Sequence, residues 1–180
     1  FGKFLTIERF HIGRPQGKLI EFIWRILRNK NENSIIPGCS DVTKPSSRGR
    51  AINGAILALL RLHKARIIVN KRNIGGIILI DRWPTNELGK MDGPRVVLGE
   101  NSGWLEHLCK HIESWAYAKM PHVDICYFFK VPIEVAIERN RLRIKENKET
   151  EEQISARFLG NIDYKPLAKK TIRFENSGEF

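Results

Sequence analysis

Cysteine, long apolar runs and metal-ligand spacings are all scarce in this sequence. Its 180 residues contain three cysteines, Cys39, Cys109 and Cys126, which lie far apart and form no C-x-x-C pair. Their spacing excludes the common zinc and dithiol motifs and favours buried thiols. No window reaches the roughly 18 consecutive apolar residues of a membrane helix, and the start FGKFLTIERF lacks the cationic and apolar segments of a signal peptide. We therefore expect a cytoplasmic protein with no membrane partner.

Acidic residues are few relative to basic ones. The chain has 31 Lys and Arg residues against 20 Asp and Glu residues, a formal net charge of +11. This balance predicts an anionic partner or substrate, and charge alone does not choose among phosphates, nucleic acid and membrane surfaces. Hydrophobic residues make up 42% of the sequence and charged residues 28%, which is typical of a folded globular domain rather than a disordered tail.

Segments with strand and helix patterns alternate along the chain. Apolar residues at three- and four-residue steps predict helices, and short apolar runs bounded by Gly or polar residues predict strands. We expect strands over 1–12, 77–80, 124–131 and 169–176, and helices over 18–29, 51–73, 103–120, 132–148 and 151–161, with a polar loop over 29–50. This alternation predicts an α/β fold, a three-layer doubly wound parallel sheet with helices on both faces, in a single domain over 1–180. Ile77–Ile80 contains no polar residue, so we expect this strand to be buried on both faces.

An acid and a base follow that apolar strand directly. Ligands of open parallel sheets bind beyond the carboxyl ends of the strands, where Asp81 and Arg82 lie. A carboxylate there can hold a magnesium-bound water or accept a proton, and a guanidinium can bind a phosphate through two hydrogen bonds. The alternative is that Asp81 caps the next turn and pairs with Arg82. The following loop adds Trp83, which could stack on a base or sugar, and Asp92 and Arg95 as substrate-binding candidates.

A second cluster is the arginine-rich end of the predicted helix over 132–148. Arg139 and Arg143 are four residues apart on one face, and Arg157 lies beyond the polar stretch KENKET. A solvated helix face is the simpler interpretation, and the charges also suit the negative end of the helix dipole. As a mobile lid over 138–158, however, these arginines would neutralise the charge on a triphosphate during phosphoryl transfer.

These two clusters carry a resemblance to a known family. Asp81-Arg82-Trp83-Pro84 resembles the Asp-Arg-x motif of thymidylate kinases and related nucleoside monophosphate kinases. HVDICYFFKVPIEVAIERNRLR resembles the family's strand and helix that lead into the lid, so the similarity covers roughly Gly75 to Asn176. It implies a P-loop kinase-like fold and transfer of the terminal phosphoryl group of ATP, with Mg²⁺, to a nucleotide acceptor such as dTMP. We also consider a homodimer.

The resemblance implies roles for the matching residues. Asp81 would lie near the metal and the reacting oxygens, and Arg82 would bind the acceptor phosphate. Arg139 and Arg143 would contact the donor phosphates. The other residues implied on the acceptor side are Glu8, Arg9 and Arg14, and those on the donor side are Arg157, Asn176 and Gly178.

The phosphate-binding loop of this family has no good match in the chain. The family motif is G-x-x-x-x-G-K-[ST], whose backbone N–H groups and lysine hold the donor phosphates. The nearest string, GRPQGKL over Gly13–Leu19, has three residues between its glycines, a proline that removes one N–H, and Leu19 where a hydroxyl should be. We therefore expect a chain incomplete at both ends, with the first strand and phosphate loop preceding Phe1. Their absence would leave a strand-wide gap or a changed pairing, and the 180 residues alone would be inactive.

Two alternatives stay open. A basic nucleic-acid-binding module would use the positive charge through phosphate contacts, but no helix-turn-helix, OB or RNA-recognition signature is present, so this partner is not expected. A kinase-like protein acting on a nucleoside, glycan or other non-nucleotide acceptor would share the mechanism and differ in the acceptor pocket. The pair His107 and His111 lacks the glutamate of an H-E-x-x-H zinc site, and Trp104 and Trp115 are interpreted as core or interface residues.

Overall fold

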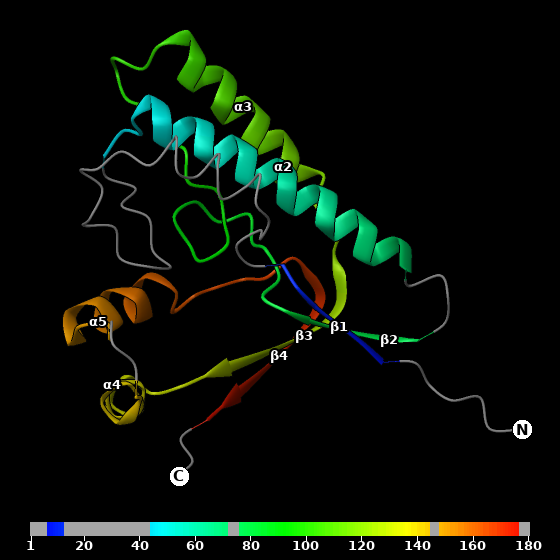
Figure 1. The fold of residues 1–180 in the computed structure, drawn as a ribbon, viewed down its shortest axis with the longest axis vertical. Coiled ribbons are helices and arrows are strands. Elements are labelled where there is room, and N and C mark those ends of the chain that lie inside the picture. Colours follow the sequence, from blue (N-terminus) through cyan, green and yellow to red (C-terminus); the bar gives the residue numbers. More distant parts are fainter. Residues whose placement is uncertain (1–6, 13–43, 72–75, 145–147, 177–180) are drawn as a thin grey trace, which may run out of the picture.

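The computed structural model describes residues 7–12, 44–71, 76–144 and 148–176. The strands are β1 (Ile7–His11), β2 (Ile77–Asp81), β3 (Val123–Lys130) and β4 (Ala168–Glu175); the helices are α2 (Arg48–Lys71), α3 (Trp104–Ala118), α4 (Ile133–Leu142) and α5 (Glu151–Gly160) (Figure 1). The predicted mixed α/β class is confirmed, and the described residues form no closed barrel. The predicted helix over 18–29 and most of the polar loop lie outside these ranges. Of the described helices, none is long and apolar enough to cross a membrane.

The four strands form two separate parallel pairs. β1 pairs with β2 from Ile7 opposite Ile77 to His11 opposite Asp81. β3 pairs with β4, and the last residues in register are Lys130 and Glu175. In the described part of the chain β2 and β3 each have one strand partner, so a continuous three-layer sheet is not confirmed.

The prediction that β2 is buried on both faces is wrong. Ile78 and Ile80 pack against the core, whereas Ile77 is 45% exposed and Leu79 50% exposed. The physical reason is that one helical layer, made of α2 and α3, lies against the strand pairs in the described residues (Figure 1). The opposite face of β3 is also apolar and exposed, through Ile125, Tyr127 and Phe129.

The core lies between that helical layer and the strands. α2 and α3 lie side by side, because small residues of α2 such as Ala51, Ala55 and Ala58 let the neighbouring chain approach closely (Figure 1). At Gly54, an added Cβ would come within 2.7 Å of a methyl carbon of Val96. The main cluster consists of Ile12, Ala58, Leu62, Ala65, Ile68, Trp83, Ala116, Tyr117, Met120 and Leu167.

The segment predicted as a lid, 138–158, includes the end of α4 and most of α5. α5 starts with the predicted capping box, in which Gln153 N–H donates to Thr150 Oγ1 and Thr150 N–H donates to Gln153 Oε1. α4 ends at Leu142 rather than near residue 148, so that predicted boundary is wrong. Lys148 Nζ donates to the carbonyl of Arg141 at 2.7 Å, which satisfies one of the carbonyls left open at the end of α4.

The two described cysteines are free thiols. Cys109 is buried and Cys126 is half-buried. Burial is the main cause that raises the pKa of each thiol, so the reactive thiolate is disfavoured. The expected buried thiol is therefore observed at Cys109, while Cys39 lies outside the described residues.

Candidate functional site

The carboxyl ends of β1 and β2 bring an acid and a histidine together. The parallel register places His11 directly opposite Asp81, and His11 Nδ1 lies 2.8 Å from Asp81 Oδ2. Both side chains are exposed, Asp81 by 74%. The hydrogen-bond partner of Asp81 is therefore His11 rather than Arg82. Sequence reasoning missed His11, and the signal that could have found it is the parallel pairing of the first strand with Ile77–Asp81.

Arg82 turns the chain sharply after the strand. Its φ of 64° lies in the left-handed region, which is uncommon for residues other than glycine and is often associated with functional sites. The turn leaves the Arg82 side chain exposed and directs Trp83 inward. Trp83 is part of the core, and its Nε1–H donates to the carbonyl of Pro121 at 3.2 Å. The ring is covered by protein, so the expected stacking role of Trp83 is corrected to a core role.

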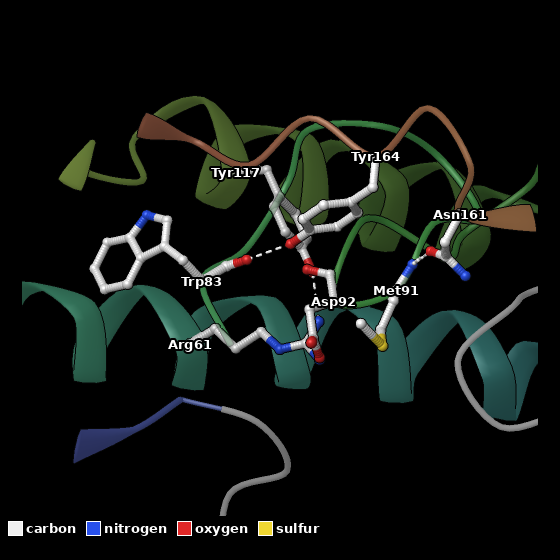
Figure 2. Close-up of polar contacts among 7 residues, drawn as sticks. All are labelled: Arg61, Trp83, Met91, Asp92, Tyr117, Asn161 and Tyr164. Carbon is white, nitrogen blue, oxygen red and sulfur yellow. Dashed lines mark hydrogen bonds and ion pairs between the residues drawn. The ribbon is translucent and has the colours of Figure 1, made fainter. Parts of the chain in front are cut away.

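The loop after Trp83 is fastened to the connection between α5 and β4. Thr85 Oγ1 donates to the carbonyl of Lys165 at 2.6 Å, and Met91 N–H donates to Asn161 Oδ1 at 2.8 Å. Tyr164 donates its hydroxyl proton to the carbonyl of Trp83 (Figure 2). These bonds join segments far apart in the sequence, so the loop has a fixed conformation.

Asp92 is at the centre of a buried polar network (Figure 2). It is 4% exposed, and its Oδ1 accepts a hydrogen bond from Arg61 Nη2 at 2.5 Å. Arg61 Nη1 donates to the hydroxyl of Tyr117 at 2.7 Å, and that hydroxyl donates to the Asp92 carbonyl at 3.1 Å. Asp92 also has a left-handed φ of 61°, which Asp tolerates better than most residues. Burial is the main cause that raises the pKa of Tyr117, so this phenol stays protonated.

This geometry makes Asp92 an anchor of the loop rather than a surface group. Its Oδ1 is bonded to Arg61, and its Oδ2 is buried without a hydrogen-bond partner. With 4% of its surface exposed, Asp92 is not positioned for the direct substrate contact that was expected of it. Sequence reasoning also missed Arg61, although a charged residue between Ala58 and Leu62 on the apolar face of α2 was a usable signal.

Arg95 is a basic residue of this loop whose side chain has a buried hydrogen-bond donor without a partner. Burial, followed by the positive charge of Arg61, lowers its pKa, while Tyr117, Asp92 and Glu113 act in the opposite direction. Its backbone N–H donates to Glu113 Oε1 at 2.8 Å, but its side-chain Nε is buried without a hydrogen-bond partner. A partly desolvated guanidinium with an unused donor favours binding an anionic oxygen. Arg95 therefore remains a candidate ligand-binding residue.

We expect Gly93→Ala to lower the free energy of unfolding by about 1–3 kcal/mol, the usual cost of overpacking. A Cβ at this position would lie 2.3 Å from the backbone oxygen of Glu87, which cannot move as a flexible side chain can. Urea unfolding of the variant beside Gly49→Ala, in the first turn of α2, measures the effect. An equal shift in both variants would contradict the steric explanation.

A pocket lies at the carboxyl ends of β3 and β4. Its volume is about 280 Å³. Arg139 Nη2 donates to Asn176 Oδ1 at 3.5 Å, a long contact that joins α4 to the residue after β4. The residues that line the pocket are Lys130, Pro132, Ile133, Glu134, Phe158 and Glu175. The pocket thus combines apolar walls with two acids and one lysine.

The basic residues of the lid-like segment differ in their partners. Arg157 Nη1 lies 2.8 Å from a carboxylate oxygen of Glu149, and Arg141 Nη2 lies 2.6 Å from Glu151 Oε1. Arg143 is exposed at the end of α4. Arg157, which was expected to bind the donor, is therefore engaged within the segment itself, whereas Arg143 is open to solvent.

The remaining acceptor-side candidates are not brought to the strand ends. Glu8 Oε2 lies 3.1 Å from Lys71 Nζ at the end of α2, and Arg9 lies opposite Leu79, two residues before the end of β2. Arg14 on the acceptor side and Gly178 on the donor side lie outside the described residues.

Asp81 is the residue that suits a magnesium ion. Mg²⁺ keeps several waters and usually takes one or two carboxylates together with substrate phosphates. Asp81 has one oxygen bonded to His11 and is largely exposed, which fits such a ligand. Over the ranges that the structure describes, no group of three or more His, Cys, Asp or Glu side chains could hold a metal by itself.

Comparisons with protein families, with curated proteins and with solved structures find no match for this chain.

Proposed function

We propose that this chain is part of a phosphotransferase that moves the terminal phosphoryl group of ATP to a nucleoside monophosphate such as dTMP. The observation that carries the proposal is where the charges lie. One parallel pair ends at His11 and Asp81, with Arg82 next in the chain, and the other ends at Lys130 and Glu175, with Asn176 next in the chain. Ligands of parallel α/β proteins bind beyond these strand ends, and the formal charge of +11 favours phosphates.

In this proposal each cluster of residues contacts a different reactant. Asp81 would hold a water of the magnesium ion, which would supply charge neutralisation at the transferred phosphoryl group. Arg82 and Arg95 would bind the acceptor phosphate, and Arg139 and Arg143 would bind the donor phosphates. The pocket between Lys130 and Glu175, next to Asn176, would receive the donor base.

The strand pairing supports the proposal that this chain is a thymidylate kinase-like P-loop kinase. If the central strand of a five-stranded parallel sheet were left out, two separate parallel pairs would remain. This is the pairing of the described strands. A further parallel strand between β2 and β3 would end at the same edge as Asp81 and Lys130. A phosphate-binding loop following that strand would then lie between the two clusters.

One observation favours a second candidate, a kinase that acts on a hydroxyl group of a nucleoside, glycan or other non-nucleotide. A hydroxyl acceptor requires a base to remove its proton, whereas a phosphate acceptor does not. With Nδ1 of His11 bonded to Asp81, its Nε2 is the nitrogen left for proton transfer. Nucleic-acid binding is less well supported, because Arg141 and Arg157 are paired with Glu151 and Glu149.

The test is ATP turnover by the full-length protein with magnesium, measured as ADP release. One panel contains nucleoside monophosphates and the other contains nucleosides and sugars. Turnover that depends on a monophosphate supports the first candidate, and turnover that depends on a hydroxyl acceptor supports the second. A folded protein that releases ADP with neither panel would rule out both.

A further inference from the structure

The connection between α5 and β4, residues 161–167, is bonded at both ends to the loop after β2. At the β4 end, Leu167 N–H donates to the carbonyl of Pro84 at 3.0 Å. At the α5 end, Asn161 Oδ1 accepts a hydrogen bond from Met91 N–H at 2.8 Å. The β4 end is part of the core, because Leu167 is buried, whereas Asn161 is only half-buried. The attachment at Asn161 is therefore the one that can change when α5 moves.

The side chain of Asn161 joins this loop to α5. Asn161 is the C-cap residue of α5, and its N–H donates to the carbonyl of Phe158 at 3.1 Å. Its side-chain Nδ2 donates to the carbonyl of Arg157 at 2.7 Å, which satisfies a carbonyl in the last turn of the helix. Figure 2 shows the other bond of this amide, to Met91, beside Asp92. A shift of the last turn of α5 therefore moves the oxygen that binds the loop.

α5 has little buried surface and also contacts the pocket at the ends of β3 and β4. Ile154 is the one buried residue of α5, and α4 has none. Elements with so few buried contacts open at a low cost in free energy, and elements that move on ligand binding are of this kind. Phe158, in the last turn of α5, lines the pocket. A molecule bound there would thus contact α5 close to Asn161.

The loop extends this connection toward Arg95. Asp92, the residue after Met91, has a left-handed φ of 61°, a conformation that persists only where surrounding contacts hold it. Asn161 holds this turn through Met91, and Arg61 holds it through the carboxylate of Asp92. The charges of Arg61 and Asp92 both act on the pKa of Arg95, so its guanidinium lies near this ion pair. A change at Asn161 can therefore reach the guanidinium of Arg95.

We propose that Asn161 couples the two ligand sites, so that a donor nucleotide in the pocket strengthens the binding of the acceptor at Arg95. This inference rests on the proposed phosphotransferase function, which supplies the two ligands. A donor base packed against Phe158 would fix the last turn of α5, and Asn161 would then hold Met91 and the turn after it. By thermodynamic linkage, the acceptor strengthens donor binding by the same factor. Asn161 is a positioning residue, because in this proposal it contacts neither ligand.

Isothermal titration calorimetry of the full-length protein tests the coupling. The dissociation constant of dTMP is measured without and with a saturating, non-hydrolysable ATP analogue and Mg²⁺. We expect the analogue to lower this constant by about 5- to 150-fold in the wild type, the usual range for coupled sites.

Two variants of Asn161 separate its two hydrogen bonds. Asn161→Asp keeps an oxygen for Met91 N–H but loses the donor to the carbonyl of Arg157. The affinity for dTMP alone should therefore stay near the wild-type value, and the effect of the ATP analogue should disappear. Asn161→Ala loses both bonds, so it should also weaken the binding of dTMP alone.

The matched control is Asn140→Ala. Asn140 Nδ2 donates to the carbonyl of Glu149 at 2.8 Å, so this amide also bonds a backbone carbonyl, but both partners belong to the segment 138–158. The effect of the analogue on dTMP binding should stay as in the wild type. If both ligands bind the wild type independently, or if Asn161→Asp keeps the full effect, the inference is overturned. Far-ultraviolet circular dichroism checks that each variant is folded.

Hydrogen exchange of the free protein distinguishes a failure of the coupling from a failure of the proposed function. If neither ligand binds, the assignment of donor and acceptor sites fails, but the link between α5 and the loop can still be measured. Glu149→Gln removes the carboxylate partner of Arg157 and should loosen α5. It should raise the exchange rate of Met91 N–H in the wild-type background and have no such effect in Asn161→Asp. An unchanged rate in the wild-type background would overturn the coupling.

Discussion

Asp92→Asn is expected to lower the free energy of unfolding by about 3–5 kcal/mol, the usual cost of breaking a buried ion pair from one side. The guanidinium of Arg61 is 2% exposed at the side chain and would lose its carboxylate partner without gaining water. Asn also tolerates the left-handed backbone at this position, so the change tests the charge rather than the turn. Equilibrium unfolding in urea, followed by circular dichroism, measures the effect.

The matched control is Asp124→Asn, which removes a carboxylate from the pair with Lys169 on the surface. That pair is 2.9 Å long but more than half exposed at both side chains, so its loss should cost about 0–1 kcal/mol. A double variant, Arg61→Met with Asp92→Asn, should recover part of the loss, because no unpaired charge then remains buried. If Asp92→Asn and Asp124→Asn were equally stable, Asp92 would not be the anchor of the loop.

Asp81→Asn is expected to reduce the turnover of the proposed phosphotransferase by about 100- to 1,000-fold, as the loss of one group that stabilises transition-state charge does. The substitution keeps the size of the side chain and removes the charge that would hold a magnesium-bound water. Because the Asp81 side chain is 74% exposed, the substitution should change the free energy of unfolding of the protein little. The readouts are kcat with the preferred acceptor and its dependence on magnesium concentration.

Arg82→Ala and His11→Gln separate the roles at the strand ends. Arg82→Ala should raise the KM for a phosphate acceptor more than it lowers kcat, because it removes binding to the acceptor phosphate. His11→Gln should be nearly silent with a phosphate acceptor and should strongly lower kcat with a hydroxyl acceptor. Asp163→Asn, at an exposed position before β4, is the control and should be silent.

Full activity of Asp81→Asn would exclude the proposed metal-binding role.

Most helices and strands could be predicted because their signals are local. The capping box of Thr150 and Gln153 and the helical period of α3 depend on neighbours within a few residues. The end of α4 was missed because the apolar and charged pattern continues past Leu142, whereas the carbonyl of Arg141 accepts its hydrogen bond from the side chain of Lys148, beyond the helix. The exposed face of β2 was missed because an apolar run does not reveal how many layers cover it.

The position of the site could be predicted from the sequence, but the contacts of its side chains could not. The acid and base at the end of β2 were expected there from the strand pattern, and the structure places Asp81 at that end. Trp83 was expected to stay available for a ligand, yet the left-handed turn at Arg82 directs it into the core. That outcome depends on the space between α2, α3 and the strands, which no local pattern specifies.

The sequence by itself determined the α/β alternation, the positive charge and the polar residues after the apolar strands. These follow from composition and from periodicities of two to four residues. Only the tertiary structure decided that His11 meets Asp81 across 70 residues and that Arg61 meets Asp92 across 31. The reason is that such contacts require distant segments to be packed in one register, and their energy depends on burial that exists only after folding.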